Sequence, residues 1–257
     1  MMPLFSKSSM IVLESLSFTK TLYAFDFDGT LAKIVSAPSD AYMTKTTESL
    51  LRELSKLVPV AIVSGRALDD LKKRVGFKPQ FLIGNHNLEI SGEEKKSIRA
   101  AMDTCQRWLE VLHSYDFGPG VEIEEKIHSL AIHYRRSRGK KEAVSKIKEA
   151  IGHLSPNARV IFGKSVVNLI PLGAPHKGTA ILDLIKRSMV KHIFYIGDDE
   201  SDEDIFSLDY TAGQIMTVRV GQKRSSQAKY YIKHQSEINH VLKTIIRFHR
   251  PILEASR

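Results

Sequence analysis

The segment Asp26-Phe27-Asp28-Gly29-Thr30 places two carboxylates two residues apart. The apolar run that leads into it, residues 22–27, predicts a buried strand that ends at the acidic pair. Parallel sheets bind ligands at this edge, and the glycine lets the chain turn and a ligand approach closely. Two adjacent anions are unfavourable unless a cation lies between them, and carboxylate oxygens suit a hard cation. The pair therefore predicts a Mg²⁺ site, although an isolated pair also fits acidic residues that merely end a strand.

A second acidic segment, residues 197–204, follows another predicted strand, residues 192–196. It reads Gly-Asp-Asp-Glu-Ser-Asp-Glu-Asp, and so many carboxylates would repel one another at a bare helix start by more than the helix dipole compensates. If some of them reach the same sheet edge as Asp26, they complete an oxygen-ligand site for Mg²⁺. Three of them fit the surface of a capped helix instead: Glu200, Glu203 and Asp204.

Two further segments could hold the oxygens of a phosphate group. Ser64-Gly65-Arg66 ends a predicted strand and opens a helix, so its hydroxyl and backbone N–H groups can bind an anion. Lys177 begins another predicted helix, where its charge opposes the helix dipole, and this favours a functional reason for the lysine. Each signal is weak alone, but their order and their positions at element ends together indicate one phosphate-handling site.

Strands alternate with helices on both sides of the middle of the chain. This alternation predicts an α/β fold, a Rossmann-like core with a parallel sheet and right-handed crossovers. The expected strands are residues 22–27, 58–63, 81–83 and 192–196, and the expected helices are residues 44–57, 67–75 and 177–189.

The middle of the chain has a different pattern, which predicts a compact α+β unit inserted into the core. We expect the core to comprise residues 1–86 and 172–257, and the insert residues 87–171. Within the insert we expect helices at 98–113 and 140–154 and strand-like segments at 121–135 and 158–170.

The composition, with 42% hydrophobic and 26% charged residues, is ordinary for a globular protein. No apolar run approaches the roughly 20 residues of a membrane span, and the N-terminus lacks the pattern of a signal peptide. The single cysteine, Cys105, fits a reducing compartment, so we expect a cytoplasmic protein.

The formal charge of +9 raises the alternative of a nucleic-acid-binding protein. Only one basic run is dense, residues 135–141, and no nucleic-acid-binding motif accompanies it. We therefore interpret the excess charge as solvated or anion-handling surface, and we expect neither a nucleic acid nor a membrane as partner.

Taken in order, the motifs resemble those of the haloacid dehalogenase superfamily of phosphotransferases. The residues in these motifs are similar to those of its trehalose-6-phosphate phosphatase branch. The likeness covers residues 23–208, and it implies that the insert is a cap that closes over a sugar and sets specificity. The motifs are Asp-Phe-Asp-Gly-Thr at 26–30, Ser-Gly-Arg at 64–66, His-Lys-Gly at 176–178 and Gly-Asp-Asp-Glu-Ser-Asp-Glu-Asp-Ile-Phe at 197–206. Four shorter segments extend it: Gly84-Asn85-His86, Glu125-Lys126, His133-Tyr134-Arg135 and Gly163-Lys164.

The resemblance also implies roles for individual residues. Asp26 would attack phosphorus and become an aspartyl phosphate, while Asp28 would protonate the departing sugar oxygen and then activate water. Mg²⁺ would be held by the Asp26 side chain, the Asp28 carbonyl and Asp198, with Asp202 close by. The residues implied to bind the phosphoryl group are Ser64, Gly65, Arg66 and Lys177. The residues implied to contact sugar hydroxyls are Glu125, Lys126, His133 and Arg135.

Three positions depart from the family's pattern. Asn87 stands where glycine is usual, but asparagine tolerates a positive φ, so we expect that turn to survive. His176 replaces the usual acid before the lysine, and the sequence offers no interpretation of it. Asn168 replaces a glutamate; it remains a substrate-binding candidate, although it cannot offer a fully charged acceptor to a sugar hydroxyl.

The predicted function is Mg²⁺-dependent hydrolysis of trehalose 6-phosphate to trehalose and phosphate, the last step of trehalose biosynthesis, with a separate trehalose-6-phosphate synthase as a candidate partner. One alternative is the phosphate of another sugar (sucrose, glucosylglycerol or mannosylglycerate), whose relatives usually carry an asparagine–aspartate pair where this chain has Ser201-Asp202-Glu203. The other is a non-catalytic regulatory subunit, against which the retained nucleophile Asp26 argues.

Overall fold

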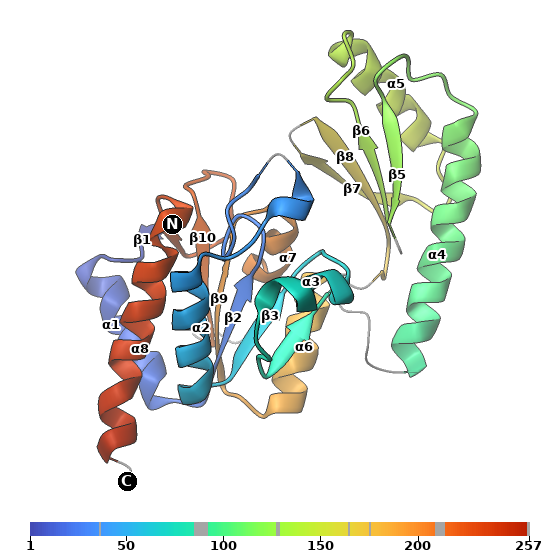
Figure 1. The fold of residues 1–257 in the computed structure, drawn as a ribbon. Helices are drawn as coiled ribbons and strands as arrows, with labels where there is room; N and C mark the ends of the chain where they lie inside the picture. The colour runs from blue at the N-terminus through green and yellow to red at the C-terminus, as the bar shows by residue number, and fades with distance from the viewer. Residues whose placement is uncertain are drawn as a thin grey trace. The chain divides into compact units, whose positions relative to one another are not determined.

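The computed structural model describes residues 1–35, 37–84, 92–126, 129–163, 165–174, 176–208 and 214–255. The chain divides into two compact units, one formed by residues 1–87 with 176–257 and the other by residues 88–175 (Figure 1). Four positions that the sequence analysis singled out lie outside the described residues: Asn85, His86, Asn87 and Lys164.

A seven-stranded sheet forms the centre of the first unit, and every pairing between its strands is parallel (Figure 1). The α/β fold expected from the sequence is confirmed. Strand β2 lies between β3 and β9, so that Ala24 pairs with Ala61 on one side and Tyr195 on the other. The strand order is β1 (Met2–Pro3), β11 (Tyr230–Ile232), β10 (Ile215–Val220), β9 (His192–Gly197), β2 (Thr21–Asp26), β3 (Val60–Val63) and β4 (Phe81–Ile83).

Helices cover both faces of this sheet, because side chains alternate along each buried strand. Tyr23 and Phe25 of β2 pack into one apolar cluster, and Leu22 and Ala24 into another. The first cluster takes in α1 (Lys7–Ser15), α2 (Lys45–Leu57), α3 (Leu68–Val75) and α8 (Ile238–Ala255), and the second takes in α6 (Lys177–Ser188) and α7 (Glu203–Phe206). Short 3₁₀ turns complete the unit: η1 (Leu16–Phe18), η2 (Pro38–Asp40), η3 (Glu200–Asp202) and η4 (Gln235–Glu237).

The second unit is a four-stranded antiparallel sheet backed by two helices, α4 (Gly92–His113) and α5 (Lys140–Gly152). The two strand-like segments expected from the sequence are each two antiparallel strands rather than one, β5 with β6 and β7 with β8. Trp108 is fully buried between the helices and the sheet, and its Nε1 donates to the Pro156 carbonyl at 2.9 Å. The sheet order is β5 (Glu122–Lys126), β6 (Ser129–His133), β8 (Val166–Pro171) and β7 (Ala158–Gly163).

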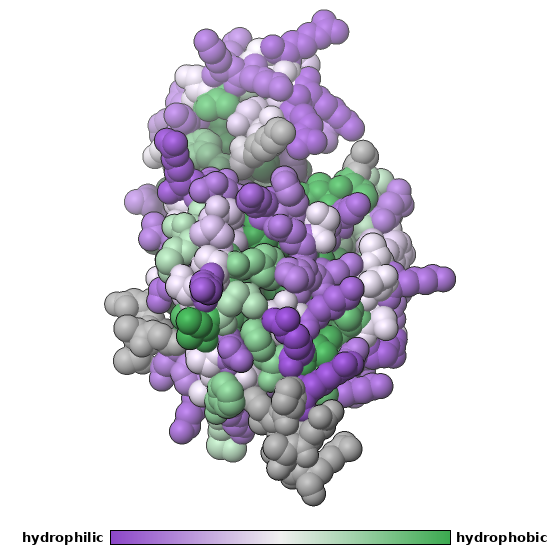
Figure 2. All heavy atoms as spheres, turned by 90° about the vertical axis from the view of Figure 1, so that its left-hand side faces the viewer, coloured by the Kyte–Doolittle hydropathy of each residue, from purple (hydrophilic) through white to green (hydrophobic). Residues whose placement is uncertain are grey.

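The surface on the side shown in Figure 2 is mostly hydrophilic, with apolar side chains scattered between the polar ones. Helix α1 contributes to the apolar part, since Ile11 is 67% exposed, and Phe18 in η1 is 72% exposed. Isolated apolar side chains of this kind are normal on protein surfaces.

A buried pair of polar rings ties β2 to the C-terminal helix. The Tyr23 hydroxyl lies 2.8 Å from His249 Nε2, and both side chains are buried in the apolar cluster between β2 and α8. Burial lowers the pKa of His249 below its ordinary value near 6.5, because the charged imidazolium loses its hydration. Folding therefore favours the neutral ring.

We predict that the protein loses stability as the pH falls below about 6.5, because the unfolded chain then binds a proton at His249 that the folded chain excludes. In His249→Gln, whose amide oxygen can still accept from Tyr23, part of that loss should disappear. Thermal unfolding followed by circular dichroism, between about pH 7.5 and 5.5, measures the difference. Identical pH dependence in the two proteins would show that His249 does not contribute.

Candidate active site

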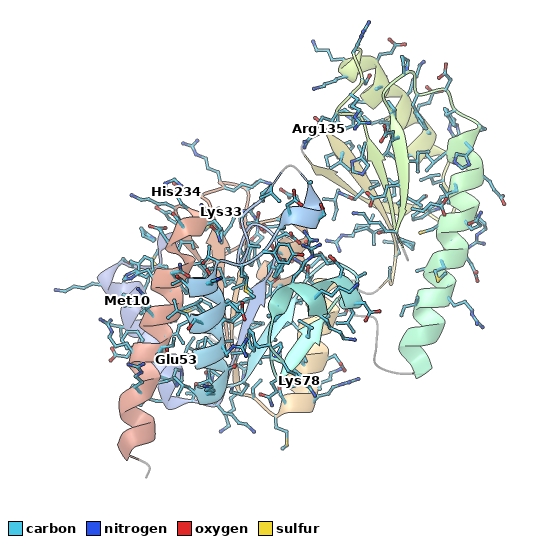
Figure 3. All side chains as sticks on the ribbon, viewed as in Figure 1. Met10, Lys33, Glu53, Lys78, Arg135 and His234 are labelled. Atoms are coloured by element: carbon cyan, nitrogen blue, oxygen red, sulfur yellow. The ribbon has the colours of Figure 1, made fainter. Side chains whose placement is uncertain are left out.

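Three carboxylates that are distant in the sequence meet where β2 and β9 end. Asp26 is the last residue of β2, and Asp198 directly follows β9, its neighbour in the sheet. Asp26, Asp198 and Asp202 each offer a ligand oxygen, and these oxygens lie within 4.8 Å of one another. Lys33 and His234, labelled in Figure 3, mark this end of the first unit.

Two glycines make room for these carboxylates. A Cβ on Gly29 would lie 2.1 Å from Oδ2 of Asp198, and Gly29 also has a φ of +82°, which favours glycine. A Cβ on Gly197 would lie 2.3 Å from the carboxyl carbon of Asp202. A side chain at either position would push one of the carboxylates out of the cluster.

Lys177, the first residue of α6, joins two of the carboxylates. Its Nζ donates to Asp26 Oδ1 and to Asp202 Oδ1, both at 2.7 Å, and all three side chains are buried. Burial acts to lower the pKa of Lys177, but the charges of Asp202 and Asp26 outweigh it and raise that pKa. The lysine is therefore a permanent cation beside Asp26.

Asp202 is the anchor of this lysine. Besides Lys177, its Oδ1 accepts from the Tyr195 hydroxyl at 2.6 Å, and its Oδ2 accepts from the backbone N–H of Asp199 at 2.9 Å. Burial acts to raise the pKa of Asp202, but Lys177 and these hydrogen bonds hold it below the ordinary value. Because both oxygens are already in use, Asp202 is less available to a metal than the other two carboxylates.

Asp26 and Asp198 have the free oxygens that a metal needs. Asp26 Oδ2 and Asp198 Oδ1 are buried and have no hydrogen-bond partner. Burial, reinforced by the neighbouring carboxylates, raises the pKa of Asp26 well above its usual range and that of Asp198 to about 7. A cation bound to these two oxygens would remove both penalties, and hard oxygen donors suit Mg²⁺. The residues present thus fit the predicted metal.

Arg219 of β10 fixes the backbone of the acidic loop. Its guanidinium donates to the carbonyls of Asp198 at 2.6 Å and Asp199 at 3.2 Å, and it pairs with Glu203 at 2.8 Å. Glu203 therefore helps to hold this loop, whereas the sequence analysis expected it on the surface of a capped helix. Asp204 is likewise buried, and its carboxylate lies 3.5 Å from His176 Nδ1.

Asp28 is held by an arginine. Arg66 donates to both oxygens of Asp28 at 2.6 Å and to Asp70 at 2.9 Å. The guanidinium expected to bind a phosphoryl group thus binds two carboxylates here. Gly65 is exposed in the same turn, and the buried Ser64 Oγ accepts from the Arg66 backbone N–H at 3.2 Å.

His176, uninterpreted in the sequence, caps the helix that begins with Lys177. Its ring Nδ1 accepts from the Gly178 backbone N–H at 3.2 Å, and its backbone N–H donates to the Thr179 hydroxyl at 3.0 Å. Any side-chain acceptor can fill this position, which explains why histidine can stand where an acid is usual.

In the second unit, strand alternation separates the expected sugar-contacting residues. The register places Lys126, His133 and Asn168 on the sheet face opposite the helices. Glu125 lies on the other face with Leu130, and its charge helps burial raise the pKa of Cys105 in α4 to about 11.

Glu124, which the sequence analysis did not single out, shares the face of Lys126 and His133. Its carboxylate lies 2.7 Å from His133 Nε2, and Ala131 of β6 pairs with both Glu124 and Asn168. Glu122 pairs with His133, and Glu124 lies two residues further along β5, so the two-residue period of a strand puts it on the same face. Arg135 follows β6 in an exposed turn of the second unit (Figure 3).

Comparison with known proteins identifies the family. Residues 24–236 match the trehalose-phosphatase family. The chain belongs to this family of phosphoric monoester hydrolases. The resemblance read from the motifs is therefore confirmed. Among the residues that the structure describes, no helix is long and apolar enough to cross a membrane.

Members of the trehalose-phosphatase family from distant organisms are similar along most of the chain. A probable trehalose-phosphate phosphatase of Oryza sativa is 26% identical over 246 residues, which are 90% of this chain and 67% of the relative. A trehalose-phosphate phosphatase of Mycobacterium ulcerans is 30% identical over 218 residues, 80% of this chain. The chain spans about two thirds of the plant relative and 56% of the mycobacterial one.

Solved structures of family members share the fold. The C-terminal domain of Candida albicans trehalose-6-phosphate phosphatase superposes with a TM-score of 0.73 at 20% identity, covering 96% of this chain and 99% of that one. Trehalose-6-phosphate phosphatase of Aspergillus fumigatus has a TM-score of 0.65 at 22% identity, with the same coverage. The C-terminal domain of a trehalose synthase regulatory protein from Candida albicans also has the fold, with a TM-score of 0.63 at 16% identity.

We predict that Mg²⁺ raises the melting temperature of the wild type, since a ligand at a hundred times its Kd stabilises by about 2.7 kcal/mol. Asp198→Asn should abolish this shift and melt no lower than the wild type without metal, because it removes one of several crowded anions. Thermal unfolding with and without MgCl₂ tests this. Asp69→Asn, at an exposed carboxylate of α3, is the control and should keep the wild-type shift in melting temperature. If Mg²⁺ still raises the melting temperature of Asp198→Asn, Asp198 is not a ligand.

Proposed function

We propose that this protein hydrolyses trehalose 6-phosphate to trehalose and phosphate, with Mg²⁺, through an aspartyl phosphate on Asp26. The observation that carries the proposal is how the two oxygens of Asp26 are bonded, in a member of the trehalose-phosphatase family. One oxygen of its buried carboxylate is held by Lys177, and the other has no protein partner. The free oxygen can attack phosphorus once a cation bound beside it keeps the carboxylate ionised.

In the first step, an oxygen of Asp26 forms a bond to phosphorus, and the bond from phosphorus to the sugar oxygen breaks. Asp28 gives its proton to the departing oxygen, and then accepts a proton from the water that hydrolyses the aspartyl phosphate. In this structure Arg66 binds both oxygens of the Asp28 carboxylate, so Asp28 must leave Arg66 and take up a proton from solvent before it acts as the acid.

Lys177 and Ser64 act on the phosphoryl group. Lys177 has three N–H bonds, of which Asp26 and Asp202 take two, so the third can bind a phosphoryl oxygen. The Ser64 hydroxyl, at the end of β3 beside β2, can donate to another. Asp26, Asp198 and the Asp28 carbonyl would hold Mg²⁺, which when bound would supply positive charge that stabilises the transferred phosphoryl group.

Sugar recognition we assign to the sheet face of the second unit that carries Glu124, Lys126, His133 and Asn168. The pairing of Glu124 with His133 supports this, since it places a charged acceptor on that face, as recognition of a sugar hydroxyl requires. Asn168 adds an amide acceptor and donor on the same face.

The nucleophile is tested by Asp26→Asn. We expect phosphate release from trehalose 6-phosphate and from p-nitrophenyl phosphate to fall at least about a thousandfold, or about 4 kcal/mol of barrier, because an amide cannot form the intermediate. The circular dichroism spectrum should stay unchanged, since the substitution preserves shape. Asp69→Asn is the matched control, and activity of Asp26→Asn within about tenfold of the wild type would contradict the covalent mechanism.

The choice of sugar is tested on a substrate panel that includes the phosphates of sucrose, glucosylglycerol and mannosylglycerate. Wild-type protein should have its highest kcat/KM on trehalose 6-phosphate. A clear preference for another sugar phosphate would move the proposal to that substrate.

Adjacent glutamates on opposite faces of β5 provide a matched pair of variants. Glu124→Ala should lower kcat/KM for trehalose 6-phosphate about ten- to a hundredfold, which corresponds to a charge-assisted hydrogen bond of about 1.5–3 kcal/mol. Glu125→Ala should leave it nearly unchanged, and neither variant should affect p-nitrophenyl phosphate, which has no sugar to bind. Equal losses on both substrates, or a larger loss for Glu125→Ala, would refute the assigned face.

A further inference from the structure

Tyr195 is a fully buried residue of β9 that the roles proposed above do not use. Its ring lies in the apolar cluster beneath α6 and α7, where it packs against Phe206. Its hydroxyl points out of this cluster and donates to Asp202 Oδ1 at 2.6 Å. That oxygen also accepts from Lys177 Nζ, which in turn donates to Asp26. A continuous line of hydrogen bonds therefore connects Tyr195 with Asp26.

The Asp202 carboxylate is fixed at both ends. Asp199 donates its backbone N–H to Oδ2, while Tyr195 and Lys177 share Oδ1. Close packing against Gly197 limits rotation further, since a Cβ there would lie 2.3 Å from the carboxyl carbon. Of these three hydrogen bonds to Asp202, the one from Tyr195 comes from a buried strand that lies between β2 and β10.

Two donors that share one carboxylate oxygen compete for it. The phenol hydroxyl takes part of the acceptor strength of Asp202 Oδ1, so the ammonium of Lys177 is drawn less strongly to Asp202 and more strongly to Asp26. Without the hydroxyl, Lys177 would move toward Asp202. Its third N–H, which has no partner among the residues that the structure describes, would then point away from Asp26.

We propose that Tyr195 is a positioning residue for the reaction, whose hydroxyl holds Asp202 so that Lys177 stays directed at Asp26 and at the phosphoryl group. This inference rests on the proposed function, because the phosphoryl group is the ligand toward which Lys177 is directed. Tyr195 acts through Asp202 and Lys177 and touches neither substrate nor reacting atoms.

The neighbouring strand supplies a matched control. Tyr23 of β2 is also buried, lies beside β9 and pairs in register with Phe194, and its hydroxyl has one buried partner, His249, at 2.8 Å. Tyr23→Phe and Tyr195→Phe each remove one buried hydroxyl from the same sheet. Both should therefore lower the melting temperature by a similar amount, but only Tyr195 is connected to Lys177.

The test compares kcat, KM and the inhibition constant of orthovanadate, a mimic of the phosphoryl transition state, for these two variants. Tyr195→Phe should lower kcat at least tenfold on both trehalose 6-phosphate and p-nitrophenyl phosphate, weaken orthovanadate binding to a similar degree, and change KM less than threefold. Tyr23→Phe should stay within twofold of the wild type in all three quantities. If Tyr195→Phe also stays within twofold, Tyr195 is only a core residue.

A double-mutant cycle with Asp202→Asn checks that Tyr195 acts through Asp202. In the Asp202→Asn background, adding Tyr195→Phe should cause less than a threefold further loss, and fully additive losses would overturn the proposal. If Tyr195→Phe does not fold, normal orthovanadate affinity in Asp202→Asn would still overturn the proposal, because Tyr195 acts only through Asp202.

Calorimetric binding of orthophosphate separates this inference from the proposed function. If the wild type releases no phosphate from any substrate, the proposed function fails. Weaker orthophosphate binding by Tyr195→Phe than by Tyr23→Phe would then still support the role of Tyr195 in directing Lys177, and equal binding would refute it.

Discussion

The buried ammonium of Lys177 between Asp26 and Asp202 is the interaction on which the rest of the site depends. Three buried or half-buried carboxylates (Asp26, Asp198 and Asp202) surround this one lysine. With all three ionised, two negative charges remain, which one Mg²⁺ would neutralise. Arg219 does not change this balance, because its guanidinium is paired with Glu203. An excess of buried anions is stable only with a cation nearby or with raised pKa values, and the pKa values of Asp26 and Asp198 are both raised.

Several strands of the sheet together position these charged groups. Strand β2 ends in Asp26, β9 leads into Asp198 and Asp202, and β10 supplies Arg219 to hold the loop between them. Glycines stand where a carboxylate must pass close to the backbone, at positions 29 and 197. Apolar clusters on both sheet faces fix the strands, so the positions of the charged groups are set by packing rather than by the charges themselves.

The second unit illustrates how strongly a β-register selects residues. Glu124 and Glu125 are chemically identical neighbours, yet one shares a face with His133 and the other lies over the helix that carries Cys105. A period of two assigns them to opposite surroundings. Any hypothesis about substrate recognition therefore has to choose between adjacent glutamates, and the hairpin register makes that choice.

The sequence by itself determined the α/β core, the acidic residues at its strand ends and the lysine that begins α6, because buried strands and helix starts have local patterns in composition and spacing. It did not determine the short strand β1, the terminal helix α8 or the two hairpins of the second unit. Tertiary structure alone decided that Asp202 holds Lys177, that Arg66 binds Asp28, that Tyr195 donates to Asp202 and that Arg219 donates to the Asp198 carbonyl. These contacts join residues from different strands and helices, and such pairings depend on how the elements pack, which no local pattern in the chain records.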